Sequence, residues 1–306
     1  MPLAGKTAAV AMPWFAYALL FGGMSIVGVY VALAKPLAAA LPVFLLAGLR
    51  FLIAAVAMIP WLRVASTDAP LTPALWRLLI LQSFLGNFLF SICMLYGVSL
   101  TSATAAGVIL AMIPAVTALF GAIWLSEPMR RSTWWAIGLA VLGITVLQLG
   151  RDAAVISLKA ASDVLLGNFL IAITVCCEAA YVVLGKKLTA RLSAKRISAI
   201  INLIGMALMA PLALWQGWGF DFASVTPSTW GQLLFYALAA SMITTWMWLT
   251  GLKTVPANQA GVFAIAMPLA ASIVGVAYLG ETFTWAHAVA LVCAVAGVVL
   301  VTRIRP

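Results

Sequence analysis

One segment of this chain occurs twice, as an internal sequence repeat. Residues 97–127 and 251–281 match at a spacing of 154 positions. The shared residues are Gly97, Gly107, Pro114, Gly121, Leu125 and Glu127, which recur as Gly251, Gly261, Pro268, Gly275, Leu279 and Glu281. Further upstream the match continues at a spacing of 151, where Tyr30, Leu33, Lys35, Leu37, Met58 and Pro60 correspond to Tyr181, Leu184, Lys186, Leu188, Met209 and Pro211. Two nearly complete copies of one unit therefore make up the chain.

The composition places both copies in a membrane. Hydrophobic residues make up 65% of the 306 residues and charged residues only 8%, whereas a soluble domain carries about 25% charged residues. The net charge of +10 does not indicate a nucleic-acid partner, because the basic residues lie in short loops between apolar segments. We expect those loops to face the lipid headgroups, so that the lipid bilayer is the partner of this surface.

Ten apolar segments approach the roughly 20 residues that a helix needs to cross a bilayer. They are residues 14–33, 41–62, 76–97, 102–125, 133–149, 164–185, 197–217, 231–252, 257–279 and 284–302. Five segments fall in each copy, so the second copy enters the membrane inverted relative to the first. The sequence predicts an all-α polytopic protein with two inverted five-helix repeats, at residues 1–150 and 151–306. Inverted repeats are typical of transporters.

The basic residues also predict the orientation. Thirteen of the 17 Lys and Arg residues fall in loops on one side, three fall on the other, and Arg50 lies within a segment. Because cytoplasmic loops carry the excess of positive charge, we expect both termini in the cytoplasm. Helix-stopping chemistry, such as Lys35-Pro36 and Gly217-Trp218-Gly219, is expected to end the segments.

The duplicated passages resemble a known family. GVILAMIPAVTALFGAIWLSEPMRRSTWWAIGLAVLGITVL and its second copy GVFAIAMPLAASIVGVAYLGETFTWAHAVALVCAVAGVVLV resemble the tandem EamA domains of the drug/metabolite transporter superfamily, as does LRFLIAA in the second segment. The resemblance covers nearly the whole chain. It implies a multi-pass carrier of the bacterial inner membrane with a central cavity between the two repeats, and many such carriers export amino acids and other small metabolites.

Two prolines are expected to weaken the helices that contain them. Pro114 and Pro268 lie mid-segment, where proline removes a backbone hydrogen bond. Gly107 and Gly261 precede them by seven residues, so each glycine lies on nearly the same helix face as its proline. Static kinks with tight helix packing would explain the pattern. The alternative is that these four residues are hinges that flex as the carrier changes its access.

Arg50 and Glu178 are the ionisable residues expected deepest in the membrane. Arg50 lies about 14 Å into a hydrocarbon core about 30 Å thick, and a lone charge at such depth costs about 3 kcal/mol or more. The repeat-related positions are Ile201 and Val27, so the shared architecture needs neither charge. The two could form a static brace, with Arg50 paired to Glu178 or bonded to helix-end carbonyls. Alternatively, Arg50 binds an anionic substrate group while Glu178 takes up a proton or an ammonium group.

Several polar and aromatic side chains could line the cavity. Asn87 and Ser91 share one helix face, and their counterparts Ser241 and Thr245 keep the same spacing. These pairs could equally form hydrogen bonds between helices. Tyr30 and Tyr181 could add aromatic contacts. The acidic residues Glu127 and Glu281 precede a helix in each copy and are expected to cap it.

These observations predict a secondary transporter that moves a small polar metabolite such as an amino acid, outward, by alternating access. We expect no catalytic residue, metal site or cofactor, and the chain lacks a phosphate-binding loop for ATP-driven pumping. Protons are the candidate coupling ion, and the protein would act as a monomer or homodimer. The alternatives are a carrier for a lipophilic cation or a nucleotide sugar, an ion channel, and a membrane enzyme acting on lipid. The only histidine, His287, lacks neighbours that would support such an enzyme.

Overall fold

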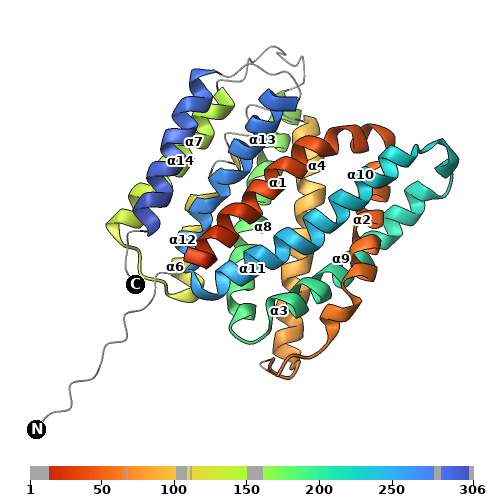
Figure 1. Ribbon diagram of the computed structural model, residues 1–306, viewed down its shortest axis with the longest axis horizontal. Coiled ribbons are helices and arrows are strands. Elements are labelled where there is room, and N and C mark those ends of the chain that lie inside the picture. The colour runs from red at the N-terminus through yellow and green to blue at the C-terminus, as the bar shows by residue number, and fades with distance from the viewer. Residues whose placement is uncertain are drawn as a thin grey trace, which may run out of the picture.

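The described residues form ten successive helical regions (Figure 1). The computed structural model describes residues 14–66, 68–100, 109–110, 112–149, 161–278 and 284–302, and these contain helices and short connections but no strand. The first repeat contributes α1 (Trp14–Ala40), α2 (Val43–Ala57), η1 (Ile59–Leu62), α3 (Pro73–Ser83), η2 (Phe84–Leu89), α4 (Phe90–Leu100), α6 (Ile113–Leu125) and α7 (Arg131–Leu149). The second contributes α8 (Ala161–Thr189), α9 (Ala194–Gly217), η3 (Phe222–Ser224), α10 (Pro227–Ala237), η4 (Leu238–Ile243), α11 (Thr244–Thr254), α12 (Ala257–Ala260), η5 (Gly261–Ile265), α13 (Ala266–Tyr278) and α14 (Trp285–Thr302). The predicted all-α, ten-pass fold is confirmed.

The helical passes differ in length and continuity. Four helical stretches within the described ranges are long and apolar enough to cross a membrane, by length and composition: Pro73–Met94, Ser162–Thr189, Ala194–Gly217 and Pro227–Thr254. The others are shorter apolar helices or are interrupted. One predicted boundary was wrong, because α1 continues past Lys35-Pro36 to Ala40. Proline lacks an N–H and crowds the preceding turn, but neighbouring helices let it bend a membrane helix instead of ending it.

The two repeats hold each other together. The most extensive helix packings join a helix of one repeat to a helix of the other, and they occur in symmetry-related sets. Helix α4 packs on α8 as α11 packs on α1, and α6 packs on α8 as α13 packs on α1. Helices α2 and α9 pack on each other, as do α7 and α14 (Figure 1). Neither repeat could bury its helix faces without the other.

Two repeat-related glycines permit the symmetric crossings. A Cβ on Gly97 of α4 would lie 2.7 Å from Ile171 Cδ1 and 3.2 Å from the Gly167 carbonyl oxygen of α8. A Cβ on Gly251 of α11 would meet the corresponding residues of α1, at 2.6 Å from Leu20 Cγ and 3.0 Å from the Ala16 oxygen. Both glycines are therefore required for helix approaches that a side chain would block.

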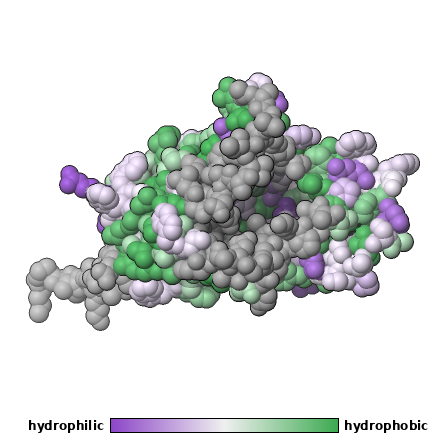
Figure 2. All heavy atoms as spheres, turned by 90° about the horizontal axis from the view of Figure 1, so that it is seen from above, coloured by the Kyte–Doolittle hydropathy of each residue, from purple (hydrophilic) through white to green (hydrophobic). Residues whose placement is uncertain are grey.

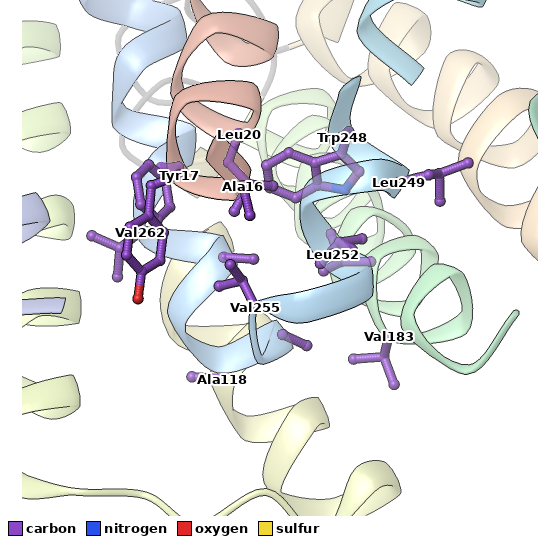
Figure 3. Close-up of a cluster of buried hydrophobic side chains, with 14 of the residues drawn as sticks. Ala16, Tyr17, Leu20, Ala118, Val183, Trp248, Leu249, Leu252, Val255 and Val262 are labelled. Carbon is purple, nitrogen blue, oxygen red and sulfur yellow. The ribbon is translucent and has the colours of Figure 1, made fainter. Parts of the chain in front are cut away.

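The largest buried cluster lies where helices of both repeats converge. Figure 3 shows Leu20 of α1 beside Trp248 of α11, whereas Tyr17 of α1 lies on the other side, beside Val262 of η5. Leu20 and Leu252 are fully buried. The exposed surface, by contrast, carries many large apolar side chains, including Trp14, Trp135, Trp215 and Trp285. Tryptophans near helix ends suit the two interfaces of a bilayer, where the indole N–H stays hydrated.

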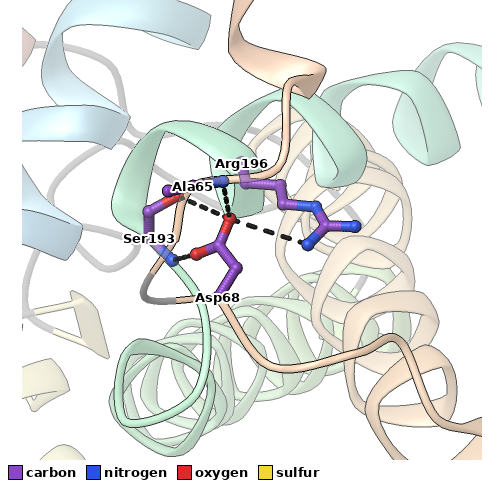
Figure 4. A network of polar contacts seen from close by, with 4 residues as sticks. All are labelled: Ala65, Asp68, Ser193 and Arg196. Carbon is purple, nitrogen blue, oxygen red and sulfur yellow. Dashed lines mark hydrogen bonds and ion pairs between the residues drawn. The ribbon is translucent and has the colours of Figure 1, made fainter.

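A buried carboxylate ties the connection before α3 to the start of α9 (Figure 4). The backbone N–H of Ala65 donates to Asp68 Oδ2 at 3.0 Å, and the Ser193 hydroxyl donates to the same oxygen at 3.3 Å. The Ser193 backbone N–H donates to Asp68 Oδ1. Arg196 Nη1 lies 3.6 Å from the carboxylate, which is the one ion pair between described residues. A carboxylate of the first repeat thus holds a helix N-terminus of the second.

Gly251→Ala should destabilise the fold, because the new Cβ would overlap Leu20 and crowd the Ala16 carbonyl. Overpacking of this kind costs about 1–3 kcal/mol, and thermal melting in detergent measures the loss. The matched control is Gly138→Ala on α7, where a Cβ has nothing within 4 Å. Equal melting temperatures for the two variants would contradict the close-approach argument.

Asp68 should stabilise the protein in a pH-dependent way. Burial raises the pKa of its carboxyl, but the hydrogen bonds from Ala65 and Ser193 and the charge of Arg196 outweigh burial and lower the pKa below 3.8. The stabilisation is therefore complete above about pH 4 and is lost as the pH falls through the folded-state pKa. We expect Asp68→Asn to lower the free energy of unfolding by about 1–3 kcal/mol at pH 7.

The measurement is thermal melting of wild type and Asp68→Asn from pH 7 to pH 3, with the exposed Asp163→Asn as the control. The difference between wild type and Asp68→Asn should shrink at the acidic end. A difference that is constant across this range would show that the Asp68 charge contributes nothing.

Candidate functional site

A π-helical segment interrupts the third helical pass of each repeat. Segment η2 separates α3 from α4, and segment η4 separates α10 from α11. The two segments span residues 84–89 and 238–243, which correspond at the repeat spacing of 154. A π-helical turn widens the helix and is frequent at functional sites. Each segment carries one predicted cavity residue, Asn87 in η2 and Ser241 in η4.

A polar cavity lies between these two segments and the α2–α9 crossing. The cavity is small in this conformation and has room for about one water molecule. Its lining comes from both repeats: Arg50, Phe51, Asn87, Ser198, Ile201, Asn202, Ala240, Ser241 and Thr245. Seen from above in Figure 2, hydrophobic side chains cover much of the described periphery, and hydrophilic colour shows near the centre of the molecule. The apolar exterior therefore encloses a polar interior.

Arg50 reaches the cavity without an anionic partner among the described residues. Its guanidinium carbon lies 4.4 Å from the centre of the Phe51 ring and 5.9 Å from that of Tyr236. Its Nε is buried and has no hydrogen-bond partner. Cation–π contact stabilises the charge by about 0.5–2 kcal/mol, but it leaves the Nε–H donor unused. The static Arg50–Glu178 brace is absent, because the structure contains no ion pair between them.

Glu178 lies close to the same group of residues from the α8 side. It is half-buried and one helical turn before Tyr181. Glu178 and Arg50 both lie near enough to Tyr30 and Tyr181 to interact with their hydroxyl groups electrostatically. The Tyr30 hydroxyl lies near Thr244 and the Tyr181 hydroxyl near Thr245, two consecutive residues of α11. Of the predicted charged and aromatic residues, Arg50 lines the cavity, whereas Glu178, Tyr30 and Tyr181 lie near Arg50 but outside the lining.

Of the two predicted cavity-lining pairs, Ser241 and Thr245 both line the cavity, whereas only Asn87 of the pair Asn87 and Ser91 does. Asn87 Nδ2 donates to the Ile201 carbonyl at 3.2 Å, and so bridges two helices while it also lines the cavity. The Ser91 hydroxyl donates to the Asn87 carbonyl at 2.6 Å within its own helix, and it is not part of the lining. Ser241 and Thr245 both line the cavity, and the buried Ser241 hydroxyl has no partner.

The predicted hinge residues Pro114, Pro268 and Gly261 occur beside or within helix interruptions, and Gly261 of the second repeat packs against Pro114 of the first. Pro114 is in the first turn of α6, immediately after a turn at Met112. Pro268 is the third residue of α13, after the 3-10 segment η5, which begins at Gly261. A Cβ on Gly261 would lie 3.3 Å from Thr117 and 3.5 Å from Pro114 Cα. Gly107 lies outside the described residues.

Two charges clamp the connection between α11 and α12 (residues 252–258). The Glu127 carboxylate accepts hydrogen bonds from the backbone N–H groups of Ala257 at 2.8 Å and Asn258 at 2.9 Å. From α8, Lys186 Nζ donates to the carbonyls of Leu252 at 2.6 Å and Val255 at 2.8 Å. Glu127 was expected to cap the helix that follows it in the sequence, and this expectation was wrong about which helix is capped. The carboxylate instead caps α12 of the other repeat, whose N–H groups point towards it.

Sequence reasoning missed four residues of this site. Phe51, Ser198 and Asn202 line the cavity, and Tyr236 packs edge-on against Tyr30 at 5.3 Å between ring centres. An aromatic residue in a membrane helix carries no signal that separates function from packing. Asn202 did carry one, because the first repeat has Phe51 at the same position. The described residues contain no group of three or more His, Cys, Asp or Glu side chains that could hold a metal.

Comparison with known proteins identifies the family. The EamA-like transporter family matches twice, over residues 14–149 and 165–303. The uncharacterized transporter YetK of Bacillus subtilis (strain 168) is 34% identical over 284 residues, which are 92% of this chain and 85% of YetK. YcxC, another uncharacterized transporter of that organism, is 25% identical over 67% of this chain and 66% of its own length.

A solved crystal structure shares the fold. It superposes with a TM-score of 0.74 over 92% of this chain and 95% of its own, at 21% sequence identity. The double family match and the YetK similarity agree with the duplicated, all-helical architecture and its central polar cavity. The chain belongs to the EamA-like transporter family.

Proposed function

We propose that the protein is a secondary active transporter that exports a small polar metabolite, such as an amino acid, across the bacterial inner membrane. Both termini would lie in the cytoplasm, as the distribution of Lys and Arg predicts. One observation carries the proposal: Arg50 presents buried, unused hydrogen-bond donor capacity in a polar cavity between two membrane-embedded repeats. Such a group is costly in a membrane protein unless it serves a ligand.

The charges around the cavity suit a substrate with groups of both signs. A guanidinium forms strong, directional hydrogen bonds with a carboxylate. Glu178, which lies near Tyr30 and Tyr181, would take up an ammonium group or a proton. The separation of Arg50 from Glu178 supports this use, because a mutually bonded pair would leave neither charge for a substrate.

Alternating access requires that the cavity close at one end while it opens at the other. In Figure 1, α12 lies towards the lower end of the bundle. The clamp of Glu127 and Lys186 would keep that lower, predicted cytoplasmic, end closed. Release of the clamp, with flexing where Gly261 meets Pro114, would open it.

The aromatic side chains support a second candidate within transport. Tyr30, Tyr236 and Phe51 surround the site, and aromatic rings bind lipophilic cations well. In that case Glu178 would be essential and Arg50 dispensable. A membrane enzyme has less support, because the relatives are named as transporters.

Arg50→Ala and Glu178→Gln should each lower counterflow of a labelled amino acid in reconstituted vesicles. Loss of a charge-assisted hydrogen bond predicts a reduction of about 10-fold or more. The exposed Arg77→Ala is the matched control and should exchange at the wild-type rate. Full activity of both variants would contradict the assigned roles, whereas loss in Glu178→Gln alone would favour the lipophilic-cation carrier.

Removal of either clamp charge should loosen the α11–α12 connection. In Glu127→Gln, the amides of Ala257 and Asn258 lose their charged acceptor, and in Lys186→Met the carbonyls of Leu252 and Val255 lose their donor. We expect hydrogen exchange in a peptide spanning residues 252–260 to accelerate about 10-fold. Lys187→Met, at the exposed neighbouring position, should leave exchange unchanged. Unaltered protection in both clamp variants would show that packing alone closes this end.

A further inference from the structure

The cavity has a hydrogen-bond acceptor whose orientation is fixed by the protein. Asn202 on α9 is only 2% exposed. Its Nδ2 donates to the Phe51 carbonyl of α2 at 2.9 Å. A carbonyl oxygen can only accept, so the atom of Asn202 that faces Phe51 must be the amide nitrogen. The other amide atom is then Oδ1, and the common uncertainty between the O and N atoms of an asparagine side chain does not arise. Oδ1 is buried and has no hydrogen-bond partner.

Unpartnered polar atoms are concentrated at this cavity. Eight buried side-chain atoms in the described part of the chain lack a hydrogen bond, and three of them belong to cavity residues: Arg50 Nε, Asn202 Oδ1 and Ser241 Oγ. An unsatisfied buried polar group costs about 1–3 kcal/mol. Three such groups belong to residues that line one cavity, and a polar guest that enters as the cavity widens would satisfy them. The three atoms offer a donor, an acceptor and a hydroxyl that can serve as either.

The repeat shows that these groups are not needed for the fold. Positions 50 and 51 of α2 correspond to positions 201 and 202 of α9, at the crossing of the two helices. The first repeat places arginine and phenylalanine there, and the second places isoleucine and asparagine. Each repeat therefore supplies one polar and one apolar residue, with the order reversed. An apolar side chain is compatible with the crossing at either position.

We infer that Asn202 is a specificity-determining residue, whose Oδ1 accepts a hydrogen bond from an N–H or O–H group of the substrate beside the anion bound by Arg50. This inference rests on the proposed function and narrows its substrate class. The substrate would carry a hydrogen-bond donor next to its acidic group, as a 2-amino or 2-hydroxy acid does. A simple carboxylate of the same size would leave Oδ1 unpaired, and sites of this kind reject such analogues.

The test compares matched pairs of labelled probes in counterflow from reconstituted vesicles. Each pair is an amino acid and the carboxylic acid that lacks only its amino group, for several side chains. Wild type should prefer the amino acid by about 10-fold in half-saturating concentration, the amount expected of one buried hydrogen bond. In Asn202→Ala the preference should fall to about 1, since neither probe finds an acceptor there.

Asn202→Asp separates recognition from structure. It retains oxygen acceptors but loses the amide donor to Phe51, so the amino acid preference should persist. If Asn202 acts only by tying α9 to α2, Asp and Ala should impair both probes of a pair equally. That equality, or unchanged preference in Asn202→Ala, would overturn the inference while the proposed function stands. Thermal melting of each variant shows whether it is folded.

The remaining outcomes concern the two proposals differently. If wild type exchanges both members of every pair equally well, the acceptor role is wrong and transport is retained. If wild type exchanges no probe of any pair, the proposed function fails, and the inference fails with it.

Discussion

The structure depends on the packing of each repeat against the other. In a bilayer, lipid competes for apolar surface as well as protein does, so helices associate through close backbone approach and buried polar contacts. Gly97 and Gly251 provide that approach at two symmetric crossings. Because the extensive packings run between the repeats, a movement of one helix in the first repeat must displace a partner in the second. A carrier that exposes its cavity alternately to two sides requires such coupling.

Departures from the internal symmetry coincide with the polar site. The backbone of the two copies matches closely enough to repeat a π-helical segment at an identical position. Yet the repeat equivalent of Arg50 is Ile201, and the repeat equivalent of Asn202 is Phe51. All four residues lie on α2 and α9, where the two repeats cross. At each of the two repeat-related positions, one copy carries an apolar residue. Under the proposed function, the polar residues of the pair serve what the cavity binds, and the symmetric framework holds them in place.

Acidic residues of the first repeat hold helix N-termini of the second. Asp68 contacts the start of α9 and Glu127 contacts the start of α12, each satisfying backbone N–H groups that a helix leaves unpaired. Lys186 adds the complementary contact with carbonyls at the end of α11. All three lie on the predicted cytoplasmic side. A small number of charged contacts therefore joins the repeats on this side, and a conformational change could break them.

The duplication and hydropathy predict much of this architecture, because a ten-pass inverted repeat follows from the apolar segments and their odd number per copy. The weakening expected at Pro114 and Pro268 coincides with interruptions at those positions. Contacts between distant segments could not be predicted from the sequence. The residues around Glu127 look the same whether its carboxylate caps the helix that follows it or a helix of the other repeat. The continuation of α1 past Pro36 depends likewise on neighbouring helices. The mismatch of Asn202 with Phe51 can be read in the sequence, but the unpartnered Oδ1 is seen only once the structure shows the amide nitrogen bonded to the Phe51 carbonyl.

The most direct measurement of the central claim is the sidedness of the cavity. A Ser241→Cys substitution places a thiol in the lining, in a variant whose four native cysteines are replaced. A membrane-impermeant maleimide is then applied to right-side-out and inside-out vesicles while an amino acid is exchanged. The account predicts that the thiol reacts from each side in turn. A thiol that reacts from one side only under all conditions, or from neither, would contradict an alternately exposed polar cavity between the repeats.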